Sequence, residues 1–138
     1  MARKILILCR ESVFNLELND ITNNNFLPEE VLKSNNNDEL YESIDRNENH
    51  FRLILESAIK KNKRLKYVAE LKNGKASVGL REIDENHNFY NIKGSDNIIL
   101  FYTSRYKDQP LIVKGAGAGA DVTAGGIFGD IIRIGKSQ

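Results

Sequence analysis

The chain has 138 residues, a net charge of +1, and charged and apolar fractions of 28% and 41%. This balance predicts one globular domain with one core, and it argues against nucleic-acid or membrane partners. The apolar runs are too short to span a membrane, and the first residues do not resemble a secretion signal. The single cysteine, Cys9, cannot form an internal disulfide, which favours a reducing cytoplasm. Its apolar surroundings indicate a buried small side chain rather than a nucleophile.

The first quarter of the chain predicts a helix, then a strand with loops, then a second helix start. Residues 2–14 carry an apolar band interrupted by cations and are expected to be helical. A buried strand over residues 5–8 is the alternative, because short apolar runs fit both structures. The asparagine-rich residues 15–27 predict a short strand and loop. Pro28, followed by two glutamates, is typical of a helix start.

The next helical region is expected to begin at the loop Asn35–Asp38, whose side chains can cap a helix. Apolar residues then recur at helical spacing, at Phe51, Ile54, Leu55 and Ala58. The region closes with four cations between positions 60 and 64, which complement the helix dipole. A phosphate site is the alternative reading of this basic cluster, and a solvated helix end is the favoured one.

The middle of the chain predicts a β-hairpin. Apolar and polar residues alternate over residues 65–71 and again over 76–80. The two runs flank Asn73–Gly74, the dipeptide best suited to a two-residue hairpin turn.

The last third predicts two more strands and a final helix. A turn is expected at Gly94–Asp96, followed by a strand over Ile98–Tyr102 that is apolar on both faces and is expected to be central in its sheet. Leu111–Val113 predicts the next strand. Helices that precede a largely antiparallel sheet, with one helix at the end, indicate an α+β fold in which the sheet packs against helices.

A glycine-rich loop, GAGAGA over residues 115–120, connects this last strand to the final helix. Its letters match the dinucleotide fingerprint, but that fingerprint also requires a following strand with an acid at its tip. Asp121 would also repel a pyrophosphate. The loop is therefore not read as the first turn of a Rossmann domain. Two interpretations stay open: a tight connection packed by small residues, or main-chain amides that contact a less charged part of a ligand.

Two stretches of the chain resemble one enzyme family in the family's own order. GAGAGADVTAGGIFGDIIR, residues 115–133, resembles the C-terminal signature of homoserine dehydrogenases. Residues 2–11 resemble the family's segment that begins D-x-A-R-K. The segment from Gly94 to Tyr102, with Arg105–Tyr106, is most similar to bifunctional forms, in which an aspartate kinase precedes the dehydrogenase. The resemblance implies a catalytic and dimerisation region over residues 1–138 that lacks the Rossmann domain.

The resemblance also implies roles for individual residues. Lys4 matches the family's proton donor and acceptor in hydride transfer between NADP or NAD and aspartate semialdehyde, which yields homoserine for threonine, methionine and isoleucine biosynthesis. Gly119 matches a glycine that contacts the cofactor, and Gly117 and Thr123 are its neighbours in the motif. The terminal helix, residues 120–136, would return to the cofactor domain. The residues leave the choice between NAD and NADP open.

Several expectations follow from what the chain lacks. The family's aspartate four positions before the lysine has no counterpart here, so the chain alone is expected to be inactive. His50 and His87 lie far apart with no cysteine nearby, so a metal site is not expected. A homodimer through the sheet is expected, and a non-catalytic dimerisation module is the alternative function. A small independent nucleotide-binding domain is a third, less favoured alternative.

Overall fold

The structure, a computed structural model, describes residues 1–137 and divides into two compact units. The first unit covers Met1–Tyr90, and the second begins at Asn91. The sequence predicted one domain, because the chain is short and has no long linker. The division follows from the strand pairing, because the described strands form one three-stranded and one two-stranded sheet with no strand in common.

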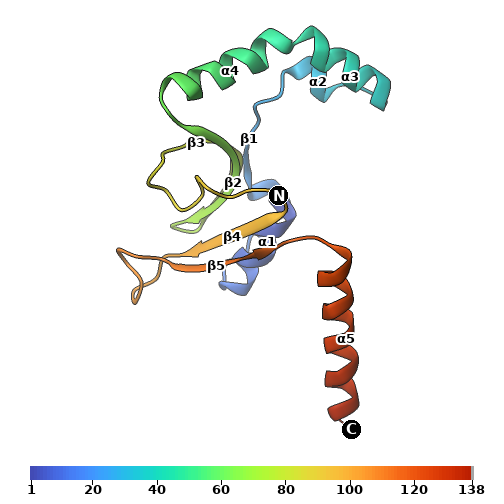
Figure 1. The fold of residues 1–138 in the computed structure, drawn as a ribbon, viewed down its shortest axis with the longest axis vertical. Helices are drawn as coiled ribbons and strands as arrows, with labels where there is room; N and C mark the ends of the chain where they lie inside the picture. Colours follow the sequence, from blue (N-terminus) through green and yellow to red (C-terminus); the bar gives the residue numbers. More distant parts are fainter. Residues whose placement is uncertain (138) are drawn as a thin grey trace. The chain divides into compact units, whose positions relative to one another are not determined.

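The first unit contains most of the helices, as Figure 1 shows. In chain order its elements are α1 (Ala2–Glu11), the 3-10 turn η1 (Leu18–Asp20), β1 (Thr22–Asn24), α2 (Glu29–Leu32), α3 (Asn37–Arg46), α4 (Glu48–Lys60), β2 (Arg64–Lys72) and β3 (Lys75–Ile83).

Helix α1 confirms the helical prediction for the first residues, and the alternative strand over residues 5–8 is wrong. The helix ends at Glu11 rather than near Phe14. Two residues later Val13 adopts a φ of 62°, a left-handed conformation that a β-branched residue rarely takes and that no continuing helix permits. The backbone therefore leaves the helical conformation before Phe14.

The hairpin prediction is confirmed, and the strands are longer than the alternating pattern indicated. Asn73 and Gly74 have φ values of 52° and 72°, as a type I′ turn requires, and Lys72 pairs directly with Lys75. β1 adds to β3 in parallel, which gives the strand order β1-β3-β2. Gly79 permits this close approach, because a β-carbon there would lie 2.7 Å from the Asn24 Cβ.

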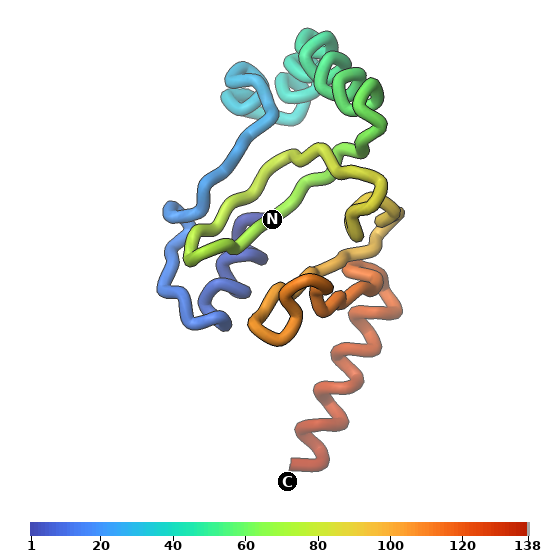
Figure 2. Tube along the Cα trace, turned by 90° about the vertical axis from the view of Figure 1, so that its left-hand side faces the viewer, coloured from blue at the N-terminus to red at the C-terminus, as the bar shows by residue number. Residues whose placement is uncertain are grey.

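The core of the first unit lies between α1 and this sheet. Its buried members are Ile5, Cys9, Ile21, Ala76 and Val78. Ile5 and Cys9 lie one helical turn apart on α1, and Ala76 and Val78 share one face of β3. The helical spacing and the strand alternation therefore bring these side chains into the same core. Figure 2 follows the trace from the α2–α4 helices into the hairpin.

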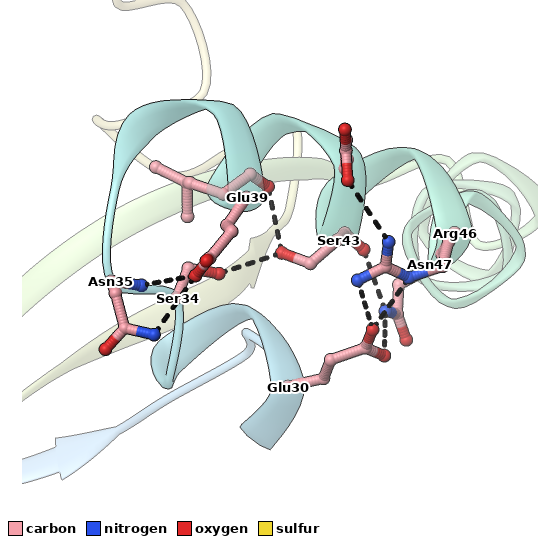
Figure 3. A network of polar contacts seen from close by, with 9 residues as sticks. Glu30, Ser34, Asn35, Glu39, Ser43, Arg46 and Asn47 are labelled. Atoms are coloured by element: carbon pink, nitrogen blue, oxygen red, sulfur yellow. Dashed lines mark hydrogen bonds and ion pairs between the residues drawn. The ribbon is translucent and has the colours of Figure 1, made fainter.

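The predicted long helical region is broken into α3 and α4 at Asn47. The Asn47 side chain donates to the Ser43 carbonyl at 2.8 Å and to a Glu30 carboxylate oxygen at 3.1 Å. Arg46 donates to the other Glu30 oxygen at 2.8 Å (Figure 3). This network ties α2 to the α3–α4 junction. One of these contacts comes from another helix, so the residues next to Asn47 account for only part of the break.

The same helices are joined at the other end of α3. Asn36 caps α3 by accepting from the Glu39 amide at 2.8 Å, which confirms the predicted cap. The hydroxyls of Ser34 and the buried Ser43 lie 3.1 Å apart (Figure 3). Hydrogen bonds from the backbone and side-chain amides of Asn35 lower the pKa of Glu39.

The basic cluster after α4 makes contacts within the unit. Lys61 pairs with Glu82 at 2.9 Å, and Lys63 pairs with Asp84 at 3.2 Å. The Arg64 guanidinium carbon lies 4.1 Å from the centre of the Tyr90 ring. These contacts join the start of β2 to the end of β3 and support the helix-end interpretation over a phosphate site.

The second unit consists of β4 (Asp96–Phe101), β5 (Leu111–Ala116) and α5 (Ala120–Lys136). The strand predicted over residues 98–102 is present as β4, but its predicted central position is wrong. Within residues 91–137, β4 pairs with β5 alone. Opposite residues of an antiparallel pair share a face. Ile99, Val113, Phe101 and Leu111 therefore form one apolar face, and each is 37% exposed or more. The strand was expected to be central because it is apolar on both faces, but these apolar side chains are exposed among the described residues.

The Glu30 network makes stability depend on pH. Hydrogen bonds from Arg46 and then Asn47 lower the pKa of Glu30, so its contribution is present above the ordinary glutamate pKa of about 4.3 and is lost as pH falls through the lowered value. We expect Glu30→Gln to lower the free energy of unfolding near neutral pH and the difference from wild type to shrink below about pH 4. Denaturant titrations across pH measure this difference. Glu85→Gln is the control, because Glu85 has no ion pair in the described chain, and an equal pH dependence in both variants would contradict the prediction.

Candidate functional site

Lys4 lies in the first turn of α1. The helix starts with the Met1 carbonyl, which accepts from the Lys4 and Ile5 amides at 2.9 and 3.2 Å. Ile5 and Cys9 fix the helix on the sheet, and this leaves Lys4 on the exposed side. Its ammonium group has no ion-pair partner among residues 1–137. Ile7, three positions along and 61% exposed, lies near Lys4 on the helix surface. A cation is therefore held on a fixed backbone with its charged end accessible.

Gly119 makes the change of direction between the strand and the final helix. Its φ of 154° and ψ of 147° lie in a region that only glycine occupies without strain. The Gly119 carbonyl accepts from the Thr123 amide at 3.1 Å, the first hydrogen bond of α5. Glycine at this position is therefore required by the backbone conformation.

The first turn of α5 presents main-chain amides without helical partners. No side chain caps this helix, so the amides of Ala120, Asp121 and Val122 are open to a ligand within the described chain. The Asp121 carboxylate complements the helix dipole but adds a negative charge. This set of donors fits a neutral hydrogen-bonding group better than a phosphate.

Gly117 is held by residues of β4 and the turn before it. Its amide donates to the Ser95 carbonyl at 3.0 Å, and the Asn97 side-chain amide donates to the same oxygen at 3.2 Å. A β-carbon on Gly117 would overlap the Asn97 side chain. Close packing therefore explains glycine at position 117, whereas backbone conformation explains it at 119.

The predicted site residues fall into two groups. Gly117, Gly119 and Thr123 lie together in the connection from β5 to α5, in the second unit, and Lys4 belongs to the first unit. Sequence reasoning did not identify Asn97 as a neighbour of the loop. The available signal was its place near the start of a strand that could pair with the strand leading into the glycines.

Other chemically active residues are in structural roles. The His50 Nε2 lies 2.8 Å from the Phe26 carbonyl, and the His87 Nδ1 accepts from the Phe89 amide at 3.1 Å. Cys9 is fully buried, as predicted, and burial raises the pKa of its thiol. No group of three or more metal-ligating residues occurs within the described part of the chain. No helix there has both the length and the apolar character to cross a membrane.

The fold is α+β, with antiparallel strand pairs and helices, as the sequence predicted. The sequence-family model for homoserine dehydrogenase matches residues 1–132. The chain therefore belongs to the homoserine dehydrogenase family.

Individual relatives agree with this family. The chain is 43% identical over 136 residues to bifunctional aspartokinase/homoserine dehydrogenase 1, chloroplastic, of Zea mays, and covers 15% of that protein. It is 37% identical over 133 residues to the bifunctional aspartokinase/homoserine dehydrogenase of Haemophilus influenzae. It is 37% identical over 137 residues to the homoserine dehydrogenase of Schizosaccharomyces pombe, of which it covers 36%. The chain thus spans a minor part of each relative.

A solved structure has the same fold. It is the crystal structure of a protein of unknown function from Candida auris, with a TM-score of 0.85 and 37% sequence identity. The match covers 98% of this chain and 38% of the other.

The conformation of Gly119 leads to a stability prediction for α5. We expect Gly119→Ala to destabilise the start of α5 by about 1–3 kcal/mol, because alanine is strained at this φ and ψ. Gly115→Ala is the matched control, since its φ is not positive and no atom lies within 4 Å of an added β-carbon. Hydrogen exchange of the Thr123 amide, which bonds to the Gly119 carbonyl, measures the effect. Equal exchange rates in the two variants would show that the conformation is not required.

Proposed function

We propose that this chain is the C-terminal part of an NAD(P)-dependent homoserine dehydrogenase, which reduces aspartate semialdehyde to homoserine. The family match over residues 1–132 supports this proposal most strongly. The similarity to bifunctional relatives supports a parent that also carries an aspartate kinase. The single buried cysteine is compatible with the cytoplasm as the compartment.

Lys4 is the proposed acid. Reduction of the aldehyde places a hydride on the carbonyl carbon, and negative charge develops on the carbonyl oxygen. An ammonium group at that oxygen stabilises the charge and transfers a proton to it, and in the reverse reaction the neutral amine takes the proton from the homoserine hydroxyl. The exposed, unpaired position of Lys4 on a fixed helix supports this role.

The loop that leads into α5 is the proposed contact to the cofactor. When bound, the nicotinamide cofactor supplies the hydride. Gly119 and Thr123 set the geometry at the start of α5, whose open amides can donate to uncharged acceptors of the cofactor. Gly117, which has no side chain, would let the backbone approach the cofactor closely. Asp121 disfavours a phosphate at this end, which agrees with the expectation that another domain holds the pyrophosphate.

Helix α5 supports the proposed return to a cofactor domain. Its exposed apolar residues Ile127, Ile131 and Ile134 recur at helical spacing and form one stripe. A stripe of this kind in a helix with no buried residue needs a covering surface. The chain alone, without such a domain, is proposed to be inactive.

A second candidate function is homodimerisation, either within the enzyme or as the chain's own role. The apolar face of β4 and β5, formed by Ile99, Phe101, Leu111 and Val113, supports it. A two-fold axis that packs this face on the same face of a second copy would cover the apolar residues of both chains.

The proton-transfer role is tested on Lys4. In the chain joined to a nucleotide-binding domain, we expect Lys4→Arg to lower kcat by about 10²–10⁴-fold, because arginine keeps the charge but does not release a proton near neutral pH. Binding of NADPH, followed by its fluorescence, is expected to be unchanged. The matched control is Arg3→Gln, which removes the neighbouring exposed cation.

Two outcomes would contradict the enzymatic proposal. One is wild-type turnover in the Lys4→Arg variant. The other is the absence of homoserine formation by the joined wild-type protein. Turnover by the 138-residue chain alone would contradict only its proposed inactivity.

The dimer is tested on the exposed strand face. We expect Val113→Glu to shift the chain from dimer to monomer in sedimentation, because the charge would be buried against a second apolar face. Tyr41→Ser, which changes a more exposed aromatic residue on α3, is expected to leave the dimer intact. A wild-type chain that sediments as a monomer at high concentration would rule out this interface.

A further inference from the structure

We propose that Asn97 is a positioning residue, which fixes the shape of the glycine loop and through it the affinity for the nicotinamide cofactor. The cofactor part of this inference rests on the proposed function. The structural part concerns one hydrogen-bonded group in the second unit: the side chain of Asn97, the carbonyl of Ser95 and the amide of Gly117.

The β4–β5 pairing brings these groups together. Asn97 lies directly opposite Gly115, and Asp96 lies opposite Ala116, the last residue of β5. Beyond that pair the regular ladder ends, and the Ser95 carbonyl accepts from the Gly117 amide at 3.0 Å. The Asn97 Nδ2 donates to the same carbonyl at 3.2 Å. One oxygen thus holds both the loop and the side chain.

The Asn97 side chain also occupies the space next to the Gly117 Cα. An added β-carbon would overlap its Nδ2 and Cγ and lie 3.2 Å from its Oδ1. Gly117 does not have a positive φ, so its conformation is open to other residues. Glycine is required there because Asn97 is in place. By contrast, an added β-carbon at Gly115 meets no atom within 4 Å.

A shift at Gly117 is transmitted to the open amides of α5. Only Ala118 separates Gly117 from Gly119, and the Gly119 carbonyl forms the first hydrogen bond of the helix. Asn97 therefore fixes the direction in which the chain enters α5. It acts on the cofactor through the loop and is not itself a catalytic residue.

The kinetic test uses Asn97→Leu in the chain joined to a nucleotide-binding domain. Leucine has a similar branched shape but no donor, so packing is largely kept and the hydrogen bond is lost. We expect the KM for NADPH to rise about five- to tenfold, with the KM for aspartate semialdehyde unchanged and kcat within about twofold. Gln109→Ala, which removes an exposed amide side chain in the same unit, is the control. An unchanged KM for NADPH would overturn the proposal.

A double-mutant cycle separates this contact from general damage. Gly117→Ala displaces the Asn97 side chain, and Asn97→Ala removes it, so both substitutions abolish the same contact. We expect the variant with both changes to have a KM for NADPH no higher than that of Gly117→Ala alone. Effects that multiply would show that the two residues act independently and would overturn the proposal.

Hydrogen exchange in the 138-residue chain tests the structural part without any activity. We expect the Gly117 amide to exchange faster in Asn97→Leu than in wild type, with the Val113 amide of β5 unchanged. If the joined wild-type enzyme forms no homoserine, the proposed function fails and this measurement still decides the role of Asn97. Unchanged exchange at Gly117 would overturn that role, whatever the enzyme does.

Discussion

The hydrogen-bonded register between β4 and β5 is the constraint on which the candidate cofactor loop depends. It sets Asn97 opposite Gly115 and brings the Ser95 carbonyl to the Gly117 amide. The loop then has a fixed start, and Gly119 turns the chain into a helix whose first amides stay open. A shift of the pairing by one residue would turn Asn97 to the other face of the sheet. The exposed donors of α5 are therefore positioned by strand pairing as much as by the glycines.

In the first unit, Lys4 is positioned by packing. Ile5 and Cys9 fix α1 against Ala76 and Val78 of β3, so the neighbouring lysine has a rigid base although its own side chain is exposed. The two groups of proposed functional residues thus differ in what positions them. A small apolar core positions the proposed acid, and backbone hydrogen bonds position the proposed cofactor contacts.

Features governed by neighbouring residues could be predicted from the sequence, and features governed by distant ones could not. Asn73–Gly74 was sufficient to predict the hairpin, because both positions need a positive φ. The break at Asn47 depends on Glu30, and the demand for glycine at 117 depends on Asn97. For the site, the glycine loop was recognised from its pattern. The roles of Lys4, Gly119 and Thr123 came from resemblance and stay predictions.

Helix α5 contains four glycines in seventeen residues, at positions 125, 126, 129 and 135. Each lowers the intrinsic preference for helix by about 1 kcal/mol relative to alanine, and a helix of this length is marginal in water without packing. Most of the favourable energy must then come from burying the isoleucine and phenylalanine side chains against a surface. Helix ordering and docking would then be one thermodynamic event, so closure of the proposed cofactor site would be coupled to assembly of the proposed enzyme.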